Sequence, residues 1–185
     1  MKNWITQIDL TTEAFQKSFG TLTEEALNWK SNPDTWSIAQ NIDHLITINE
    51  TYFPILVALK TGKYQPHFMA KIGFLTSFFG NMLLKSVQPT TSKKIKTFPI
   101  WEPAKSQIPK DILNRFTKHQ AQLKQEIEAT KTLIDNGAVI SSPANKFIVY
   151  KLATAFDIIV AHEQRHLTQA KAILVELKNR RVSDE

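Results

Sequence analysis

Residues 156–173, FDIIVAHEQRHLTQAKAI, decide the fold and contain the most informative motif of the chain. Apolar residues recur at steps of three and four on both sides of the motif, which is the spacing of one buried face of an α-helix. This face runs through Phe156, Ile159, His162, His166, Ala170 and Ile173. Both histidines are therefore expected to point into the interior of a helical protein.

Helical periodicity continues along most of the chain, which contains only five glycines. The sequence predicts an all-α protein with long helices over about 4–19, 38–60, 108–135 and 144–179, and a short helical piece after Thr23. Ser37 is the expected cap of the second long helix, and Pro54 is expected to kink it. Residues 61–107 form a proline-rich crossover with an irregular helix over about 69–85. A crossover of this length lets helices two and three run parallel, so we expect an up-down-down-up four-helix bundle.

The composition is typical of a folded protein. With 185 residues, 42% hydrophobic and 22% charged, we expect one domain spanning residues 1–185. There is no cysteine, which excludes thiolate ligands and a protein cysteine nucleophile, so any metal must use nitrogen or oxygen ligands. No stretch approaches the roughly 20 apolar residues of a membrane span or resembles a signal peptide, so we expect a cytoplasmic location.

The net charge of +6 is moderately basic. The basic residues are scattered, apart from Lys93, Lys94 and Lys96, and no exposed aromatics are interleaved with arginine, so we expect no nucleic-acid partner. The phenylalanine-rich segment around 74–79 is compatible with a membrane-surface role. A buried lid or a subunit interface is the more common explanation, and we expect no membrane partner.

His162 and His166 lie four residues apart, one helical turn along the same face, so both imidazoles can bind one ion. Charged, unpaired imidazoles in a protein interior are costly, and a metal ion removes that problem. The alternative is that each imidazole only hydrogen-bonds to a neighbour. Glu163 occupies the glutamate position of the zincin motif, but nothing downstream of His166 offers the third histidine of metzincins.

His44 is a third histidine expected to point inward, from the second long helix. Three neutral imidazoles would leave coordination positions open on zinc or nickel, as in catalytic rather than structural sites. The carboxylates considered for orienting an imidazole or acting as a base are Asp43, Glu50, Asp157 and Glu163. His67 and His119 are isolated and expected on the surface, whereas Trp4 and Trp36 are expected to be core anchors.

The pattern Pro33-x-x-Trp36-Ser37-x-x-x-Asn41-x-x-His44-Leu45, followed by His162-x-x-x-His166, resembles the DinB-like superfamily of metal-binding four-helix bundles. The resemblance covers essentially the whole chain. It implies that His44, His162 and His166 form a metal triad, that the bundle is up-down-down-up, and that the protein is a homodimer.

Characterised relatives in that superfamily include S-transferases and isomerases that use bacillithiol, mycothiol or glutathione. The resemblance therefore implies a metal-dependent transferase with a low-molecular-weight thiol cosubstrate, since the protein has no thiol of its own. An anionic thiol would be attracted by the crossover lysines Lys71, Lys85, Lys93, Lys94 and Lys96. The alternatives are a metal-dependent hydrolase and a non-enzymatic metal-binding or stress-associated interaction module.

Overall fold

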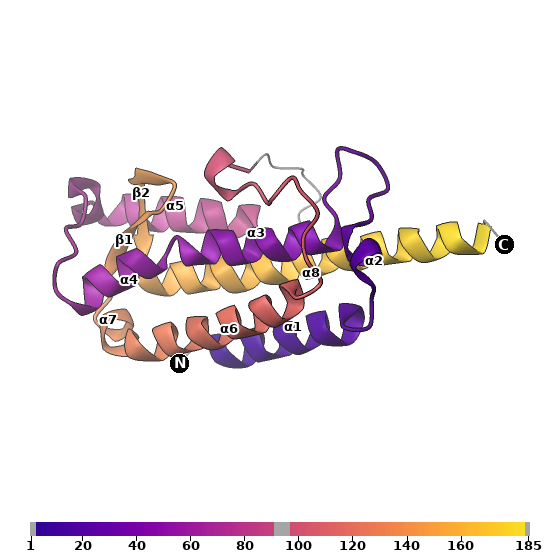
Figure 1. Ribbon diagram of the computed structural model, residues 1–185. Helices are drawn as coiled ribbons and strands as arrows, with labels where there is room; N and C mark the ends of the chain where they lie inside the picture. The colour runs from indigo at the N-terminus through magenta and orange to yellow at the C-terminus, as the bar shows by residue number, and fades with distance from the viewer. Residues whose placement is uncertain (1–2, 91–96, 184–185) are drawn as a thin grey trace.

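The computed structural model describes residues 3–90 and 97–183, so Lys93, Lys94 and Lys96 lie outside the described residues. The chain is mostly helical and carries one small two-stranded sheet within the described residues (Figure 1). The elements are α1 (Trp4–Phe19), α2 (Glu24–Asn28), α3 (Ile38–Glu50), α4 (Phe53–Lys60), η1 (Phe68–Lys71), α5 (Gly73–Ser86), η2 (Pro99–Trp101), α6 (Ile112–Ala129), α7 (Lys131–Asp135), β1 (Val139–Ser142), β2 (Asn145–Lys151) and α8 (Leu152–Ser183).

Four long helices enclose the interior. Helices α1 and α3 each pack against both α6 and α8, which brings all four around a shared core. The predicted all-α class is therefore broadly correct, whereas the up-down-down-up order stays a prediction. Within the described residues, no helix is both long and apolar enough to cross a membrane.

Local sequence signals set several helix boundaries. The Thr23 side chain accepts a hydrogen bond from the backbone of Ala26 at the start of α2. Ser37 and Gln40 form a reciprocal capping box at the start of α3, as the predicted cap requires. Pro54 lies in the first turn of α4, and the chain breaks into two helices before it instead of continuing as one kinked helix.

The predicted start of the last helix, about residue 144, is wrong. Residues 139–151 form an antiparallel β-hairpin, and α8 begins only at Leu152. The run Ile148-Val149-Tyr150 carries branched and aromatic side chains that favour a strand, and the Tyr150 hydroxyl lies 2.9 Å from that of Tyr52 in the interior. The start of the third long helix also differs: α6 begins at Ile112 rather than near residue 108.

The interior is divided into two apolar clusters. One gathers around Trp4, Leu123 and Phe156, and the other around Phe15, Ile42 and Phe116. Buried polar side chains occupy the intervening positions of the four long helices: Thr11, Asn49, His119, Gln120, Glu163 and His166. We call this set the polar layer. It places polar chemistry in the middle of the helical body, where α3 and α8 pack together.

His119 belongs to this layer, so its predicted surface position is wrong. Its side chain is only 5% exposed, and its ring stacks on Phe53 with centroids 5.4 Å apart. Among the described residues, neither ring nitrogen has a hydrogen-bond partner. Burial lowers the pKa of His119 to about 4, so the imidazole is neutral at pH 7.

We expect His119→Phe to stabilise the protein, because it removes two unpaired buried nitrogens while keeping a ring against Phe53. The midpoint temperature should rise by about 2–6 °C at pH 7.5, measured by thermal unfolding. His67→Phe, at a half-buried histidine, is the control and should change it less. A lower midpoint for His119→Phe would contradict this.

The effect of His119→Phe on stability should also depend on pH. The pKa of His119 is about 4 in the folded protein against 6.5 for the free side chain. The unfolded chain therefore binds the extra proton first, and stability present above pH 6.5 is lost as the pH falls towards 4. The stability advantage of His119→Phe should grow over this interval, and an advantage that is constant with pH would contradict the burial argument.

Candidate metal centre

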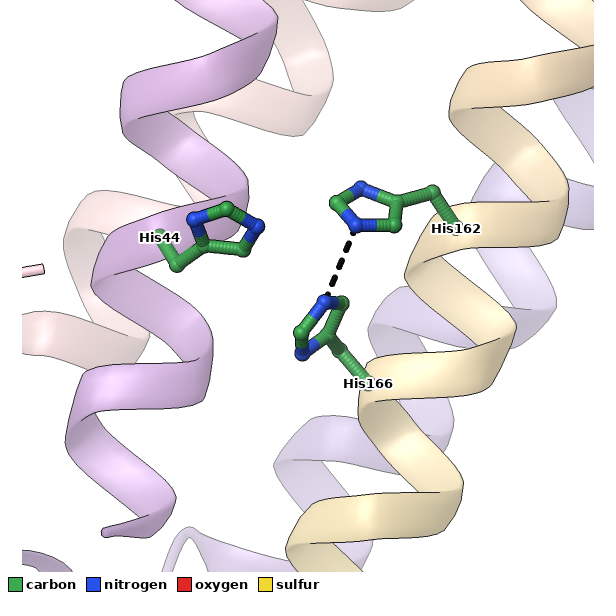
Figure 2. Close-up of side chains that lie close together, drawn as sticks. All are labelled: His44, His162 and His166. Carbon is green, nitrogen blue, oxygen red and sulfur yellow. Dashed lines mark hydrogen bonds between the residues drawn. The ribbon is translucent and has the colours of Figure 1, made fainter. Parts of the chain in front are cut away.

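Two helices bring three histidines together. His44 comes from α3, and His162 and His166 come from successive turns of α8. Figure 2 shows the three rings facing one another between these helices. One nitrogen from each ring lies within 4.8 Å of the other two, and the Nε2 atoms of His162 and His166 are 3.0 Å apart. The inward register predicted from the helical periodicity is confirmed.

Protein acceptors determine which nitrogen of two rings carries the proton. The Nδ1 of His44 lies 2.6 Å from the backbone oxygen of Trp101, so Nδ1 donates and Nε2 keeps a free lone pair. The Nδ1 of His166 lies 2.7 Å from Oδ1 of Asn41. The other end of that amide donates to the Ser37 carbonyl at 2.9 Å, which fixes the amide so that its oxygen faces His166.

This arrangement fits a divalent metal ion. Metal-binding histidines commonly donate their second nitrogen to an acceptor, which orients the ring and raises its basicity. Metal–nitrogen bonds of about 2.0–2.1 Å in tetrahedral geometry place two ligand nitrogens about 3.3 Å apart, close to the 3.0 Å between His162 and His166. A cation would satisfy the lone pairs that converge here from His44 and His166.

The electrostatics of the site also favour neutral ligands. Burial lowers the pKa of His162 and His166 well below the ordinary value, and the neighbouring histidines and Arg165 lower it further. Burial also lowers the pKa of His44, although the Trp101 carbonyl and Asp43 act in the opposite direction. All three imidazoles are therefore neutral at pH 7, which is the form that binds a metal.

The three histidines differ in burial. His44 and His166 are 2% and 6% exposed, whereas His162 is half-buried. The Trp36 ring lies 4.8 Å from His44 and stacks on His166 at 5.9 Å. Trp36 is thus a half-buried wall of the site rather than the core anchor predicted for it, whereas Trp4 does lie in the core.

Glu163 follows His162 in sequence but is held by other helices. Its two carboxylate oxygens accept hydrogen bonds from Asn49 of α3 and Gln120 of α6, each at 2.8 Å. The side chain is fully buried, and burial raises the pKa of Glu163 to about 7. The residue in the zincin glutamate position therefore links three helices in the polar layer.

The comparison with protein families agrees with the geometry. The family model of the DinB superfamily matches residues 7–170. The chain belongs to the DinB superfamily. Comparison with curated proteins gives no match, and comparison with solved structures gives none either. The DinB match covers α1 through the triad on α8, so it includes the elements that carry all three histidines.

In this DinB protein, the acceptors behind His44 and His166 are a backbone carbonyl and an amide, not the carboxylates considered from sequence. Asp43 instead accepts from the backbone of Ala104 and pairs with Arg115 at 3.5 Å. Asp157 accepts from Trp4 of α1. Asn41 lies one turn after Ser37 and three residues before His44. This spacing is the sequence signal that could have identified Asn41 as the acceptor behind a histidine of the triad. The Trp101 contact uses the backbone, so no side-chain pattern identifies it.

We expect His162→Ala to abolish stoichiometric binding of divalent metal, because two imidazoles remain where three converge. Metal content of untagged protein, loaded at neutral pH and desalted, measures this. His67→Ala is the control, since His67 lies outside the triad and contacts Phe68 and Phe147. Failure of the wild-type DinB protein to retain about one equivalent under these conditions would contradict the site itself.

Asn41→Ala should weaken metal binding about 10–100-fold, because His166 loses the acceptor that orients its ring. Titration calorimetry with zinc measures the affinity. Asn41→Asp keeps an acceptor at that position and should retain most of the affinity. Asn28→Ala removes an asparagine whose side chain hydrogen-bonds, among the described residues, to backbone atoms of Glu24 and Ile108, and should leave zinc affinity unchanged. Equal losses in Asn28→Ala and Asn41→Ala would contradict an orienting role.

Proposed function

We propose that His44, His162 and His166 bind one divalent metal ion, zinc or nickel, and that the protein is a transferase using a low-molecular-weight thiol cosubstrate. The proposal rests on the convergence of three neutral imidazoles, of which that of His162 is only half-buried. Three protein ligands leave at least one coordination position for an exogenous group. When bound, a divalent ion lowers the pKa of a thiol or water molecule that it coordinates.

The chain itself contributes the ligands, their orientation and the exclusion of solvent. The Trp101 carbonyl and Asn41 hold two rings in the binding tautomer, and Trp36 shields one side. In the proposed reaction the thiol sulfur forms a bond to the electrophilic atom of the second substrate. The leaving group departs with its bonding electrons, and the thiol proton passes to solvent. The protein has no cysteine, so the sulfur must come from the cosubstrate.

The environment of Glu163 favours thiol transfer over hydrolysis. A hydrolase of the zincin type needs this carboxylate as a general base for water. Here both oxygens are committed to Asn49 and Gln120 in the interior. A thiol, whose pKa is about 8.5, needs less help with deprotonation than water does, so a site without a free carboxylate suits a thiol better. We further expect a homodimer and a cytoplasmic location.

The metal-loaded protein should consume glutathione, mycothiol or bacillithiol in the presence of an electrophile such as a chlorodinitrobenzene or an epoxide. Thiol loss above the uncatalysed rate measures this. His44→Ala should abolish the activity and His67→Ala should retain it. Ester or amide turnover without thiol would instead establish the hydrolase, and neither activity in the metal-loaded protein would favour the non-enzymatic module.

The Glu163→Gln variant further distinguishes a thiol transferase from a hydrolase. It should leave thiol transfer within about tenfold of wild type, whereas loss of a general base typically lowers a hydrolytic rate by about 10²–10⁴-fold. Thermal unfolding of the variant shows whether the polar layer tolerates the amide. A loss of thiol transfer beyond a hundredfold in a folded, metal-loaded Glu163→Gln variant would contradict the role assigned to Glu163.

A further inference from the structure

The fully buried positions of helix α5 are two small residues, Thr76 and Gly80. Leu83 and Leu84 of the same helix are partly buried against the core. A Cβ atom at Gly80 would lie 3.0 Å from Cγ2 of Thr154 and 3.4 Å from Cβ of Tyr150, so the backbone of α5 approaches α8 and β2 closely. This close packing commits the small side of the helix to the interior.

The exposed side of α5 carries three large apolar residues. Phe74, Phe78 and Met82 follow one another at four-residue steps and are 72%, 58% and 45% exposed. Phe68 and Phe147 are also exposed, and both contact the His67 ring, which joins η1 to the hairpin. We call this surface the crossover face, made of Phe68, Ile72, Phe74, Phe78, Met82 and Phe147. In Figure 1, α5 lies beside the hairpin, away from α1 and α6.

An apolar stripe is normally buried by folding, whereas the fold holds this one outward. The small side of α5 fits the close approach to Thr154, and a phenylalanine there would not. Folding therefore leaves Phe74, Phe78 and Met82 exposed on α5. Large exposed apolar patches mark interaction surfaces in folded proteins.

The charge of the surrounding segment indicates what that partner is. Residues 61–107 contain seven lysines and one acidic residue, Glu102, whereas the rest of the chain contains sixteen basic and sixteen acidic residues. The whole net charge of +6 therefore resides in the crossover. The hairpin adds Lys146 and Lys151 without an acidic residue. Lys63, Lys71 and Lys146, within the described residues, are exposed.

This charge argues against a second copy as the partner. A two-fold interface places the same patch on both sides, so the exposed Lys71 and Lys146 of one copy would face those of the other and repel. The partner must instead combine an apolar layer with negative charge. A lipid surface with anionic headgroups has both, and phenylalanine and lysine are the residues that interfacial helices use to bind it.

We propose that the crossover face binds an anionic lipid surface, with Phe74, Phe78 and Met82 entering the interface and the surrounding lysines meeting the headgroups. The inference does not depend on the metal centre. It differs from the sequence-based expectation of no membrane partner, which took a buried lid or a subunit interface as the more common explanation of the phenylalanine-rich segment.

Vesicle flotation tests the proposal. The full-length protein should float with vesicles of phosphatidylcholine and phosphatidylglycerol, should not float with phosphatidylcholine alone, and should detach as salt is raised. Phe74→Ser/Phe78→Ser should lower the partition coefficient at least about tenfold. The matched control is Leu10→Ser/Val175→Ser, which removes two apolar side chains that are each 55% exposed on α1 and α8. This control should bind like wild type.

A charge variant tests the second half of the proposal. Lys71→Glu/Lys146→Glu should lower binding to the anionic vesicles, whereas Lys17→Glu/Lys171→Glu makes the same charge change on exposed positions of α1 and α8 and should lower it much less. Thermal unfolding and metal content check that all variants are folded. These readouts are independent of any catalytic activity.

Three results would overturn the proposal. One is a wild-type protein that stays unbound to the anionic vesicles at low salt. Another is equal loss of binding in the face variants and in their matched controls, which would indicate nonspecific attraction of a basic protein. The third is a wild-type dimer that Phe74→Ser/Phe78→Ser converts to a monomer, which would assign the face to self-association.

Discussion

The structure depends on keeping three uncharged imidazoles in the middle of a helical body. Burial disfavours the protonated form of each ring, and two hydrogen-bond acceptors, the Trp101 carbonyl and the Asn41 amide, direct the remaining lone pairs to one point. That arrangement sets the packing of α3 against α8. It also explains why η2, far from either helix in sequence, must be anchored beside His44.

The polar layer extends this constraint to a third helix. Glu163 joins α8 to Asn49 of α3 and Gln120 of α6, and hydrogen bonds to a buried carboxylate are worth about 1.5–3 kcal/mol each. An axial slip of any one of these helices would leave a buried polar group unpaired. Apolar side chains in the two flanking clusters tolerate such a slip far better, because dispersion and burial are not directional. The layer therefore specifies the register in which the triad assembles.

Sequence patterns located the features that depend on nearby residues. The cap at Ser37 and the inward register of His162 and His166 follow from spacing within a few turns, whereas the kink predicted at Pro54 is a break between α3 and α4. Features that depend on distant residues were missed. His119 shows ordinary helical periodicity, yet tertiary packing against Phe53 buries it. The hairpin over 139–151 is stabilised by Tyr52 and by α5, neither of which lies near it in sequence. The contact between His44 and Trp101 uses a backbone carbonyl. Every residue type has this group, so the sequence gives no signal for it.

The orientation of helix α5 exposes aromatic side chains whose burial would have stabilised the fold. A helix that served only the core would place Phe74 and Phe78 inward and Thr76 and Gly80 outward, since burying an aromatic ring contributes about 1.5–3 kcal/mol. The observed orientation forgoes that gain, and a Cβ atom at Gly80 would lie only 3.0 Å from Cγ2 of Thr154, so a large side chain does not fit at that position without a shift of its neighbours. Within the described residues, the exposed Lys71 and Lys146 directly neighbour Ile72 and Phe147 of the face in sequence, and their charge opposes self-association through it. An outward aromatic stripe with exposed lysines beside it is complementary to a surface that is both anionic and apolar, which is why the proposed partner of the crossover face is a lipid surface.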